Sequence, residues 1–251
     1  MHHFFVSSGA DADGLIRIGG SDYNHLRNVL RMKPGDMVVV SDGSENDWYC
    51  LIQCYQDEEA VLAVTEEAEV RELDFGMDLY QGLPKSDKMD LIVQKAVELG
   101  VRRIVPVEMK RCVVKLDGKK KEGRLRRWSA ISESAAKQCG RGMVPEVGPF
   151  VSIADAAGML GAYDVILVPY ENENGMAGTA RALDLIKPGM TAAVFIGPEG
   201  GFDLSEVELL KAAGARTVSL GKRILRTETA GLVALSWLML RVELSSAVEK
   251  V

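Results

Sequence analysis

From residue 77 onward, apolar segments of strand length alternate with amphipathic segments of helix length, and this pattern restricts the fold more than any other feature. Such alternation is typical of βα units, which build a mostly parallel sheet. We expect strands at residues 77–80, 103–107, 165–168, 192–196 and 217–220. We expect helices at about residues 86–99, 122–139, 153–160, 179–186, 203–213 and 227–244. The fold class that follows is α/β.

The first 70 or so residues have a different pattern, in which short β-rich segments are separated by turn signals. Strands are expected at residues 4–7, 15–18, 37–41, 48–55 and 60–65, with one helix at 21–31. This pattern predicts a small β-barrel or sandwich. An acidic stretch at 66–74 leads to a boundary near residue 72, so we expect domains at 1–72 and 73–251.

Charge is unevenly distributed along a chain whose net charge is −6. Residues 85–141 hold 16 Lys and Arg against 7 Asp and Glu, a net charge of +9, and the remaining residues carry −15. A segregated basic segment in an acidic protein is typical of a surface that binds a polyanion. A solvated basic helix surface is the alternative.

Several classes of site are disfavoured by the histidine and cysteine content. The three histidines all lie within the first 25 residues, which argues against a Ser-His-Asp or Cys-His hydrolase. The spacing of the four cysteines does not suit a zinc site, and we expect reduced thiols and no metal. Two of them, four residues apart in a predicted strand, should point to the same face. These cysteines are Cys50, Cys54, Cys112 and Cys139.

Membrane targeting is not indicated. No apolar run approaches the roughly 20 residues that span a bilayer, and the N-terminal segment lacks the basic and apolar regions of a signal peptide. We therefore expect a cytoplasmic protein.

A glycine loop, Gly197-Pro198-Glu199-Gly200-Gly201, joins the strand at 192–196 to the next helix. It lacks the Lys-Ser/Thr pair of a P-loop, and Glu199 would repel a phosphate. Asp203 as N-cap and Glu206 at the third helical position predict a capping box, so these two residues are interpreted as structural. The glycines allow close approach of a ligand to the backbone. A nucleoside with a positive charge fits this loop, and a tight turn that binds nothing is the alternative.

Two more loops should lie close to this one. Ligands of parallel sheets bind beyond the carboxyl ends of the strands, which places the loops at 169–175, 197–203 and 221–226 together. The last of these is rich in cations, and the helix that follows is apolar nearly all round. A helix of that kind is buried on more than one side, against the sheet and against a partner such as a second subunit.

Six blocks of the sequence resemble the bacterial 16S rRNA uridine N3-methyltransferase family (RsmE) of the SPOUT superfamily. Two are IGPEGGF at 196–202 and the LG-RILRTETA pattern at 220–230. The others are HLRNVLRMKPGD at 25–36, LPKSDKMDLIVQKAVELGV at 83–101, RW at 127–128 and SAAKQCGRGMVPEV at 134–147. The resemblance covers essentially the whole chain. Cys139 stands where the family pattern suggests a small residue.

This resemblance implies a PUA-like RNA-binding barrel, a C-terminal SPOUT domain with a trefoil knot, bound S-adenosylmethionine and a homodimer that joins the knotted domains. The implied substrate is 16S rRNA within the assembled small ribosomal subunit. The residues implied to bind the cofactor are Pro169, Tyr170, Glu171, Ile196, Gly197, Pro198, Glu199, Gly200, Gly201, Leu220, Gly221, Ile224, Leu225, Thr227 and Thr229. The basic residues expected to bind rRNA are His25, Arg27, Arg31, Lys110, Arg111, Lys119, Lys120, Arg124, Arg127, Lys137 and Arg141.

Methylation at N3 requires uridine to lose a proton, so we expect either a base or a group that stabilises negative charge on O2 and O4. Arg226 is the candidate for charge stabilisation, with a phosphate contact or a salt bridge as the alternative. Glu228 or Glu199 is the candidate base. Two other functions remain open: a ribose 2′-O-methyltransferase of the same superfamily, and a catalytically silent rRNA-binding assembly factor.

Overall fold

The computed structural model describes residues 1–44, 46–69, 71–173 and 175–249, and the chain divides into two compact units. The first unit comprises residues 1–72 and 136–144, and the second comprises 73–135 and 145–251. The first unit thus takes in a short segment, 136–144, that the predicted boundary at 72 had left in the second domain. Residues 45, 70 and 174, which fall within the predicted barrel and the predicted loop at 169–175, lie outside the described residues, as do 250 and 251.

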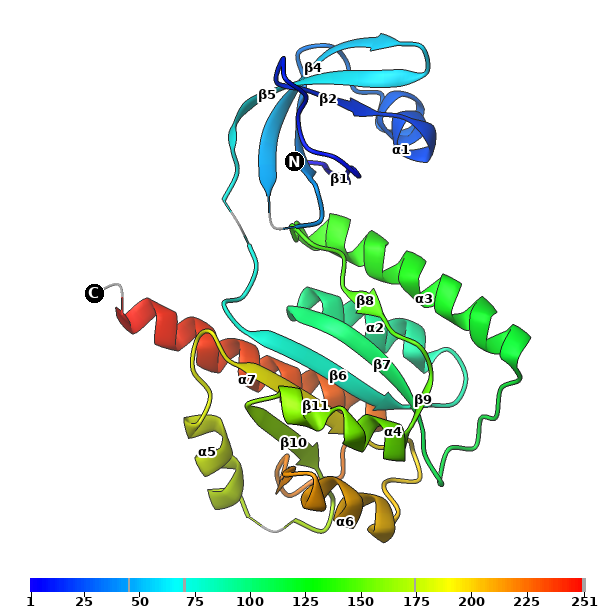
Figure 1. The fold of residues 1–251 in the computed structure, drawn as a ribbon, viewed down its shortest axis with the longest axis vertical. Coiled ribbons are helices and arrows are strands. Elements are labelled where there is room, and N and C mark those ends of the chain that lie inside the picture. The colour runs from blue at the N-terminus through cyan, green and yellow to red at the C-terminus, as the bar shows by residue number, and fades with distance from the viewer. Residues whose placement is uncertain (45, 70, 174, 250–251) are drawn as a thin grey trace. The chain divides into compact units, whose positions relative to one another are not determined.

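In the described part of the first unit, five strands form one sheet in the order β1-β3-β4-β5-β2 (Figure 1). The strands are β1 (His3–Phe5), β2 (Leu15–Ile18), β3 (Met37–Ser41), β4 (Asp47–Gln56) and β5 (Glu59–Glu67). Only β1 and β3 pair in parallel, and the other pairs are antiparallel. Alternate residues of these strands point into one apolar core that includes Phe4, Ile16, Val38, Ile52 and Leu62.

The helix predicted at 21–31 is present in a different form. An α-helix, α1 (Gly20–Asn24), runs directly into a π-helix, η1 (His25–Val29). The amide of Leu30 bonds to the carbonyl of His25 in the wider i to i+5 pattern, and Arg31 has a φ of 55°. The wider turn keeps Leu26 fully buried in the core. Hydrophobic spacing alone does not distinguish a π-turn from an α-turn.

The expectation that Cys50 and Cys54 share a face is wrong. Cys50 is buried and Cys54 is exposed. The pairing of β4 with β5 shifts register between Ile52 and Cys54, and an extra residue at such a bulge reverses which side the following residues face.

A buried polar chain links three strands of the first unit. His3 on β1 contacts the hydroxyl of Ser41 on β3 at 2.5 Å, and Ser41 donates to Asp47 on β4. All three side chains are buried. Burial lowers the pKa of His3 to about 4, with the nearby charges of Arg71 and Lys137 acting in the same direction.

The second unit is built on a parallel sheet, as the alternation of segments predicted. Its described strands follow the order β12-β10-β11-β6-β7-β8, with β9 also paired to β7, and each of these pairings is parallel. The strands are β6 (Gly76–Gly82), β7 (Val101–Glu108), β8 (Glu146–Val147), β9 (Val151–Ser152), β10 (Val165–Pro169), β11 (Thr191–Ile196) and β12 (Arg216–Val218). The two-residue strands β8 and β9 were not predicted.

The helices of this unit begin and end within a few residues of the predicted positions. They are α2 (Lys88–Glu98), α3 (Gly118–Cys139), α4 (Ile153–Gly158), the 3-10 turn η2 (Leu160–Ala162), α5 (Ala177–Asp184), α6 (Leu204–Ala212) and α7 (Thr227–Glu249). The end of α3 belongs to the first unit. Among the starts that differ, α2 begins later than residue 86 because Ser86 has a φ of 55°, and α3 already includes the lysine run at 119–121.

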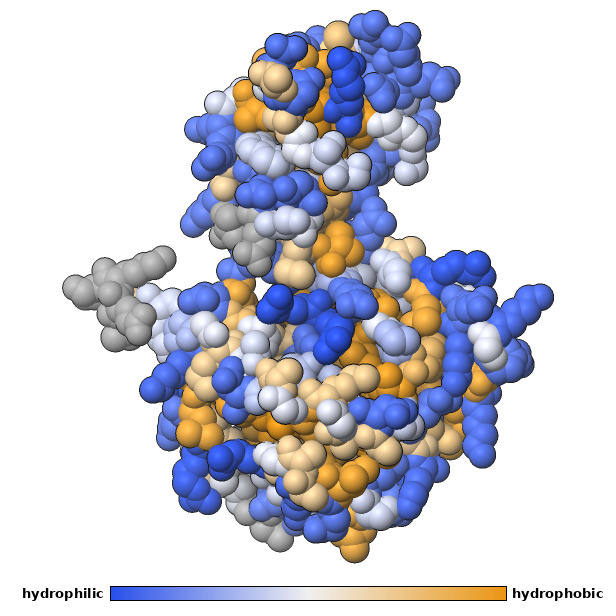
Figure 2. All heavy atoms as spheres, in the orientation of Figure 1, coloured by the Kyte–Doolittle hydropathy of each residue, from blue (hydrophilic) through white to orange (hydrophobic). Residues whose placement is uncertain are grey.

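Helix α7 packs against α2 and against strands β6 and β11. Within the described residues, Thr227–Ala247 is the single helical segment that is long and apolar enough, by length and composition, to cross a membrane. The expectation that no segment approaches that length is therefore wrong, because scattered polar residues interrupt the run without lowering its average hydropathy enough. A core helix of a soluble protein passes the same test. Apolar residues also come to the surface of the second unit, among hydrophilic ones (Figure 2).

Candidate cofactor-binding and catalytic site

A cavity of about 550 Å³ lies in the second unit beyond the carboxyl ends of β10, β11 and β12. Its walls come from four segments of the chain, three of which are the loops that the sheet pattern brings together. The lining residues are Lys88, Pro169, Tyr170, Glu171, Ile196, Gly197, Pro198, Glu199, Gly200, Gly201, Phe202, Ser219, Leu220, Gly221, Lys222, Arg223, Ile224, Leu225, Arg226, Thr227 and Ala230.

The glycine loop after β11 is packed closely against the end of β6. A Cβ added to Gly82 would lie 2.7 Å from Cδ and 2.8 Å from the backbone nitrogen of Pro198. Gly201 has a φ of +67°, a conformation that glycine adopts without steric cost. The sequence at these positions therefore fixes the path of the loop backbone that faces the cavity.

Thr227, at the start of α7, holds the other end of this loop. Its hydroxyl donates to the carbonyl of Gly197 at 2.6 Å and accepts from the side-chain amide of Gln81 on β6 at 2.9 Å. Both side chains are buried. This chain of hydrogen bonds connects β6, the loop and α7 behind the cavity.

The predicted capping box at the start of α6 is confirmed. Asp203 accepts from the amide of Ser205, and Glu206 accepts from the amide of Asp203 at 2.9 Å. Glu206 is 1% exposed and also accepts from the backbone amide of Lys110 at 2.7 Å. One carboxylate thus joins the helix start to the segment that follows β7.

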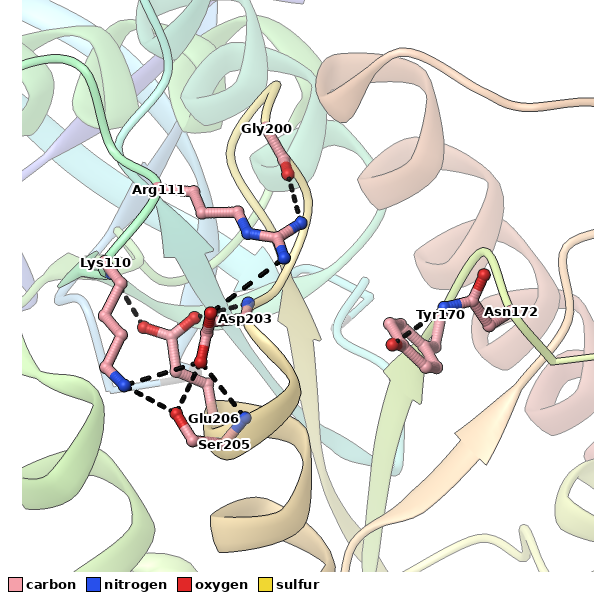
Figure 3. A network of polar contacts seen from close by, with 8 residues as sticks. All are labelled: Lys110, Arg111, Tyr170, Asn172, Gly200, Asp203, Ser205 and Glu206. Atoms are coloured by element: carbon pink, nitrogen blue, oxygen red, sulfur yellow. Dashed lines mark hydrogen bonds and ion pairs between the residues drawn. The ribbon is translucent and has the colours of Figure 1, made fainter.

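Arg111 contacts the glycine loop, and Lys110 contacts the start of α6 (Figure 3). The Lys110 ammonium lies 2.6 Å from the hydroxyl of Ser205 and 3.4 Å from Asp203. The Arg111 guanidinium donates to the carbonyl of Gly200 at 3.1 Å. Both side chains stay about half exposed, at 63% and 47%. In the loop after β10, Asn172 donates to the hydroxyl of Tyr170 at 2.9 Å (Figure 3).

Three charged groups meet at one edge of the cavity. The ammonium of Lys88 lies 3.0 Å from a carboxylate oxygen of Glu199 and 3.2 Å from Oε2 of Glu228. The hydrogen bond to Glu199 raises the pKa of Lys88, and Glu228 acts in the same direction. Burial would raise the pKa of Glu199, but hydrogen bonds from Lys88 and from the amide of Lys85 outweigh it, so that the pKa is lowered.

Most residues expected at the cofactor site line this cavity, as do the proposed catalytic residues Arg226 and Glu199. Glu228 is placed at the cavity through its ion pair with Lys88. Thr229 is an exception: it is exposed and does not line the cavity. Two helical positions after Thr227, its side chain points about 200° around the helix axis, away from the loop.

Sequence reasoning missed several lining residues, of which Lys88 makes the largest difference to the electrostatics. No turn or motif rule marks a lysine at the start of a helix as a ligand-site residue. Its proximity to Glu199 depends on the pairing of β6 with β11. Ser219 and Ala230 were also missed, whereas Phe202, Lys222 and Arg223 lie within the predicted loops 197–203 and 221–226.

The basic residues expected to bind RNA in the second unit are only partly free of ion pairs. Arg127 pairs with Asp90 at 2.6 Å, and Arg124 lies 3.7 Å from Asp87. Lys120 pairs with Asp117 within the first turn of α3. The side chains of Lys119 and Lys120 are exposed. Surface pairs of this kind are weak and exchange readily for phosphate contacts.

In the first unit, Arg27 lies over the rings of Tyr23 and Tyr55, at 5.7 Å and 5.3 Å from their centroids. Arg27, His25 and Arg31 are exposed. Their exposure is compatible with binding an RNA strand, and an arginine stacked on aromatic rings is a recurrent element of single-strand recognition.

The expectation that Arg141 contacts RNA is wrong. Its side chain is 5% exposed and donates to the carboxylate of Glu72 at 2.6 Å. A guanidinium that is buried in such a pair is unavailable to a phosphate. Lys137 likewise pairs with Asp22 at 2.9 Å, with its side chain 23% exposed. Both pairs fix the segment 136–144 within the first unit.

Metal binding finds no support in the described part of the chain, where no cluster of three or more His, Cys, Asp or Glu side chains could hold an ion. Cys50, Cys54 and Cys112 are free thiols.

Two family models match the chain. Residues 71–239 match an RNA methyltransferase domain, and residues 18–53 match the PUA domain of RNA methyltransferases. The first match alone spans more than half of the chain.

Relatives of known name agree with these matches. The chain is 36% identical to the ribosomal RNA small subunit methyltransferase E of Bacillus subtilis, over 90% of both chains. It is 30% identical to the protein of the same name from Mycobacterium bovis, over 92% of this chain and 88% of the relative. A crystal structure of the Neisseria gonorrhoeae protein of that name, bound to S-adenosylmethionine, superposes with a TM-score of 0.83 and 30% identity, covering 96% of this chain and 98% of the other. The chain belongs to the ribosomal RNA small subunit methyltransferase E family.

Proposed function

We propose that this protein transfers a methyl group from S-adenosylmethionine to N3 of a uridine in 16S rRNA. The observation that carries the proposal is the cavity formed by the glycine loop together with the loops that follow β10 and β12. Membership in the family supports the cofactor and the class of substrate.

The residues present fit the cofactor. A cavity of about 550 Å³ lies within the range typical of small-molecule sites, about 300–1,000 Å³. Gly197, Gly200 and Gly201 line the cavity without side chains, so a ligand can approach the backbone closely there. Glu199 and Glu171, which would repel a phosphate, are favourable neighbours for a sulfonium cation.

The reaction requires an electrophilic methyl group and a uridine that loses its N3 proton. The cofactor supplies a methyl group that is made electrophilic by its positively charged sulfur. The uridine must lose the N3 proton, and the negative charge spreads to O2 and O4. Arg226 is exposed at the cavity wall, and we propose that its guanidinium donates hydrogen bonds to these planar oxygens, a geometry to which it is suited.

The base is assigned to Glu228 rather than Glu199. Glu199 already accepts hydrogen bonds from Lys85 and Lys88, and its lowered pKa makes it a weak base. Oε2 of Glu228 accepts no hydrogen bond from the described residues. This oxygen is buried and lies 3.2 Å from the Lys88 ammonium, so we propose that the other carboxylate oxygen of Glu228 accepts the N3 proton.

The basic surfaces account for binding of rRNA. On α3, Lys119, Lys120, Arg124 and Arg127 present cations to solvent or in weak surface pairs, and His25, Arg27 and Arg31 do so in the first, PUA-like unit. Each phosphate contact adds roughly 0.7 to the slope of log affinity against log salt for single-stranded RNA. We propose that the physiological substrate is the assembled small subunit, in which the target strand is held in one conformation.

We further propose a homodimer through the second unit. Leu240 and Leu244 on α7 are 51% and 56% exposed, which is costly for leucines on a helix that is apolar nearly all round. The trefoil knot stays a prediction. The cytoplasm is the proposed location, because it holds the ribosomal subunits and keeps free thiols reduced.

The proposal is tested on rRNA from a strain that lacks the gene and from the same strain complemented with the wild-type chain. After digestion of 16S rRNA to nucleosides, mass spectrometry should find 3-methyluridine only in the complemented strain. A 2′-O-methyl nucleoside found only in the complemented strain would show that the protein methylates the ribose and would refute methylation at N3. Identical nucleoside profiles would favour a role in rRNA binding without catalysis.

A further inference from the structure

Lys88 belongs to the segment 83–101, which no part of the function described so far explains. It sits at the start of α2, and its ammonium joins two parts of the cavity that lie far apart in the sequence. The loop carboxylate of Glu199 is 3.0 Å away and that of Glu228, in the first turn of α7, is 3.2 Å away. The three side chains are mostly shielded from solvent, with 25%, 26% and 17% of their surface exposed.

Glu228 depends on Lys88 for compensation of its charge. Its Oε2 atom is buried, and the ammonium of Lys88 lies 3.2 Å from it. The acidic groups next to Lys88 on its own side of the cavity are already paired: Asp87 lies 3.7 Å from Arg124, and Asp90 pairs with Arg127. Lys88 instead forms ion pairs with both site carboxylates, Glu199 and Glu228.

We infer that Lys88 is a positioning residue that ties the glycine loop to α7 and compensates the two carboxylates, Glu199 and Glu228, at the edge of the cavity that receives the sulfonium cofactor. This inference rests on the proposed function. With Lys88 present, the three groups carry a net charge of −1. Without it, two carboxylates would face each other, and the loop and the helix would repel.

If the charge of Lys88 matters, its removal should affect charged and neutral ligands differently, which the loss of a purely structural contact would not do. S-adenosylmethionine carries a positive sulfur, whereas the product S-adenosylhomocysteine is neutral there. We expect Lys88→Met to loosen the glycine loop and so to weaken the binding of both S-adenosylmethionine and S-adenosylhomocysteine. The extra negative charge offsets this loss for the cation only, so the ratio of the two dissociation constants shifts toward S-adenosylmethionine. For one unit of charge at a partly shielded site, we expect a shift of roughly fivefold, smaller at high salt.

Three further variants isolate the charge. Lys88→Arg retains the cation and should keep the ratio within about twofold of the wild-type value. Glu228→Gln removes one negative charge and should shift the ratio the opposite way. Lys88→Met combined with Glu228→Gln restores the net charge and should return the ratio to near that of the wild-type protein. Lys95→Met is the matched control, because Lys95 lies on the same helix and its ion pair among the described residues is with Glu98, at 2.7 Å.

The experiment is isothermal titration calorimetry of each variant with both ligands, after thermal unfolding has shown a cooperative transition. Opposite shifts for Lys88→Met and Glu228→Gln, cancelled in the double variant, support the inference. Equal losses of affinity for both ligands in a folded Lys88→Met protein would overturn it. If Lys88→Met does not fold, an unchanged ratio in Glu228→Gln overturns it equally. Failure of the wild-type protein to bind either ligand would instead refute the proposed function.

Discussion

Gly82 provides the sharpest test of how the cavity is built. It ends β6, and a Cβ at this position would lie 2.7 Å from Cδ of Pro198, 2.8 Å from its nitrogen and 2.9 Å from the sulfur of Met109. Cβ atoms in proteins essentially never approach another heavy atom closer than 3.0 Å. The methionine can move aside, but Pro198 is a ring fixed to the backbone. In Gly82→Ala, the glycine loop must therefore shift.

The magnitude follows from the cost of overpacking a closely packed site, about 1–3 kcal/mol. In a protein of this size that corresponds to a fall in melting temperature of about 2–12 °C. The shifted backbone also lines the cavity, so we expect the affinity for S-adenosylmethionine to fall by about tenfold or more, since small misplacements of preorganised groups have large effects.

Thermal unfolding and calorimetric titration of S-adenosylmethionine measure the two effects. Gly123→Ala is the matched control: Gly123 lies within α3, and its added Cβ meets no atom within 4 Å. The same substitution should there stabilise the protein by about 0.5–1 kcal/mol, because alanine favours a helix. A Gly82→Ala protein with wild-type stability and affinity would refute the argument that this contact positions the loop.

Other sites give further expectations. Glu206→Ala should lower the free energy of unfolding by about 2–4 kcal/mol, because it leaves two backbone amides unpaired. Glu208→Ala, at an exposed position of the same helix, should change it by less than about 0.5 kcal/mol. Chemical denaturation measures both values. Arg226→Ala should lower turnover by about 100-fold with little change in cofactor affinity, and unchanged turnover would end the catalytic assignment. Burial lowers the pKa of His3 from 6.5 to about 4, so the unfolded state binds the extra proton between these pH values. Stability should be full above pH 6.5 and fall as the pH drops toward 4, by at most about 3 kcal/mol; in His3→Gln this slope should flatten, and an identical slope would contradict the assignment.

Features that depend on local sequence could be predicted. The alternation after residue 77 predicted the parallel sheet, and the order of residues from Gly197 to Gly201 predicted a loop that leaves its backbone accessible. The capping box of Asp203 and Glu206 follows from spacing alone. The loop and the capping box are set by neighbours within about four residues, which a single sequence shows directly.

Features that depend on tertiary pairing could not be predicted. Arg141 looks in the sequence like any other cation of a basic segment, and only the fold reveals that Glu72, 69 residues away, buries it. Lys88 is brought to Glu199 by the pairing of β6 with β11, which no spacing rule encodes. The change from α1 to the π-turn η1 is similar, because both helix types keep Leu26 on the buried side.

The most direct test of the central claim uses purified components. The protein, S-adenosylmethionine labelled in its methyl group, and small ribosomal subunits that lack the modification are incubated, and the rRNA is digested to nucleosides. We predict that the label appears in 3-methyluridine and that Arg226→Ala sharply reduces it. Label in any other nucleoside, or no transfer from a cofactor that the protein demonstrably binds, would contradict the account.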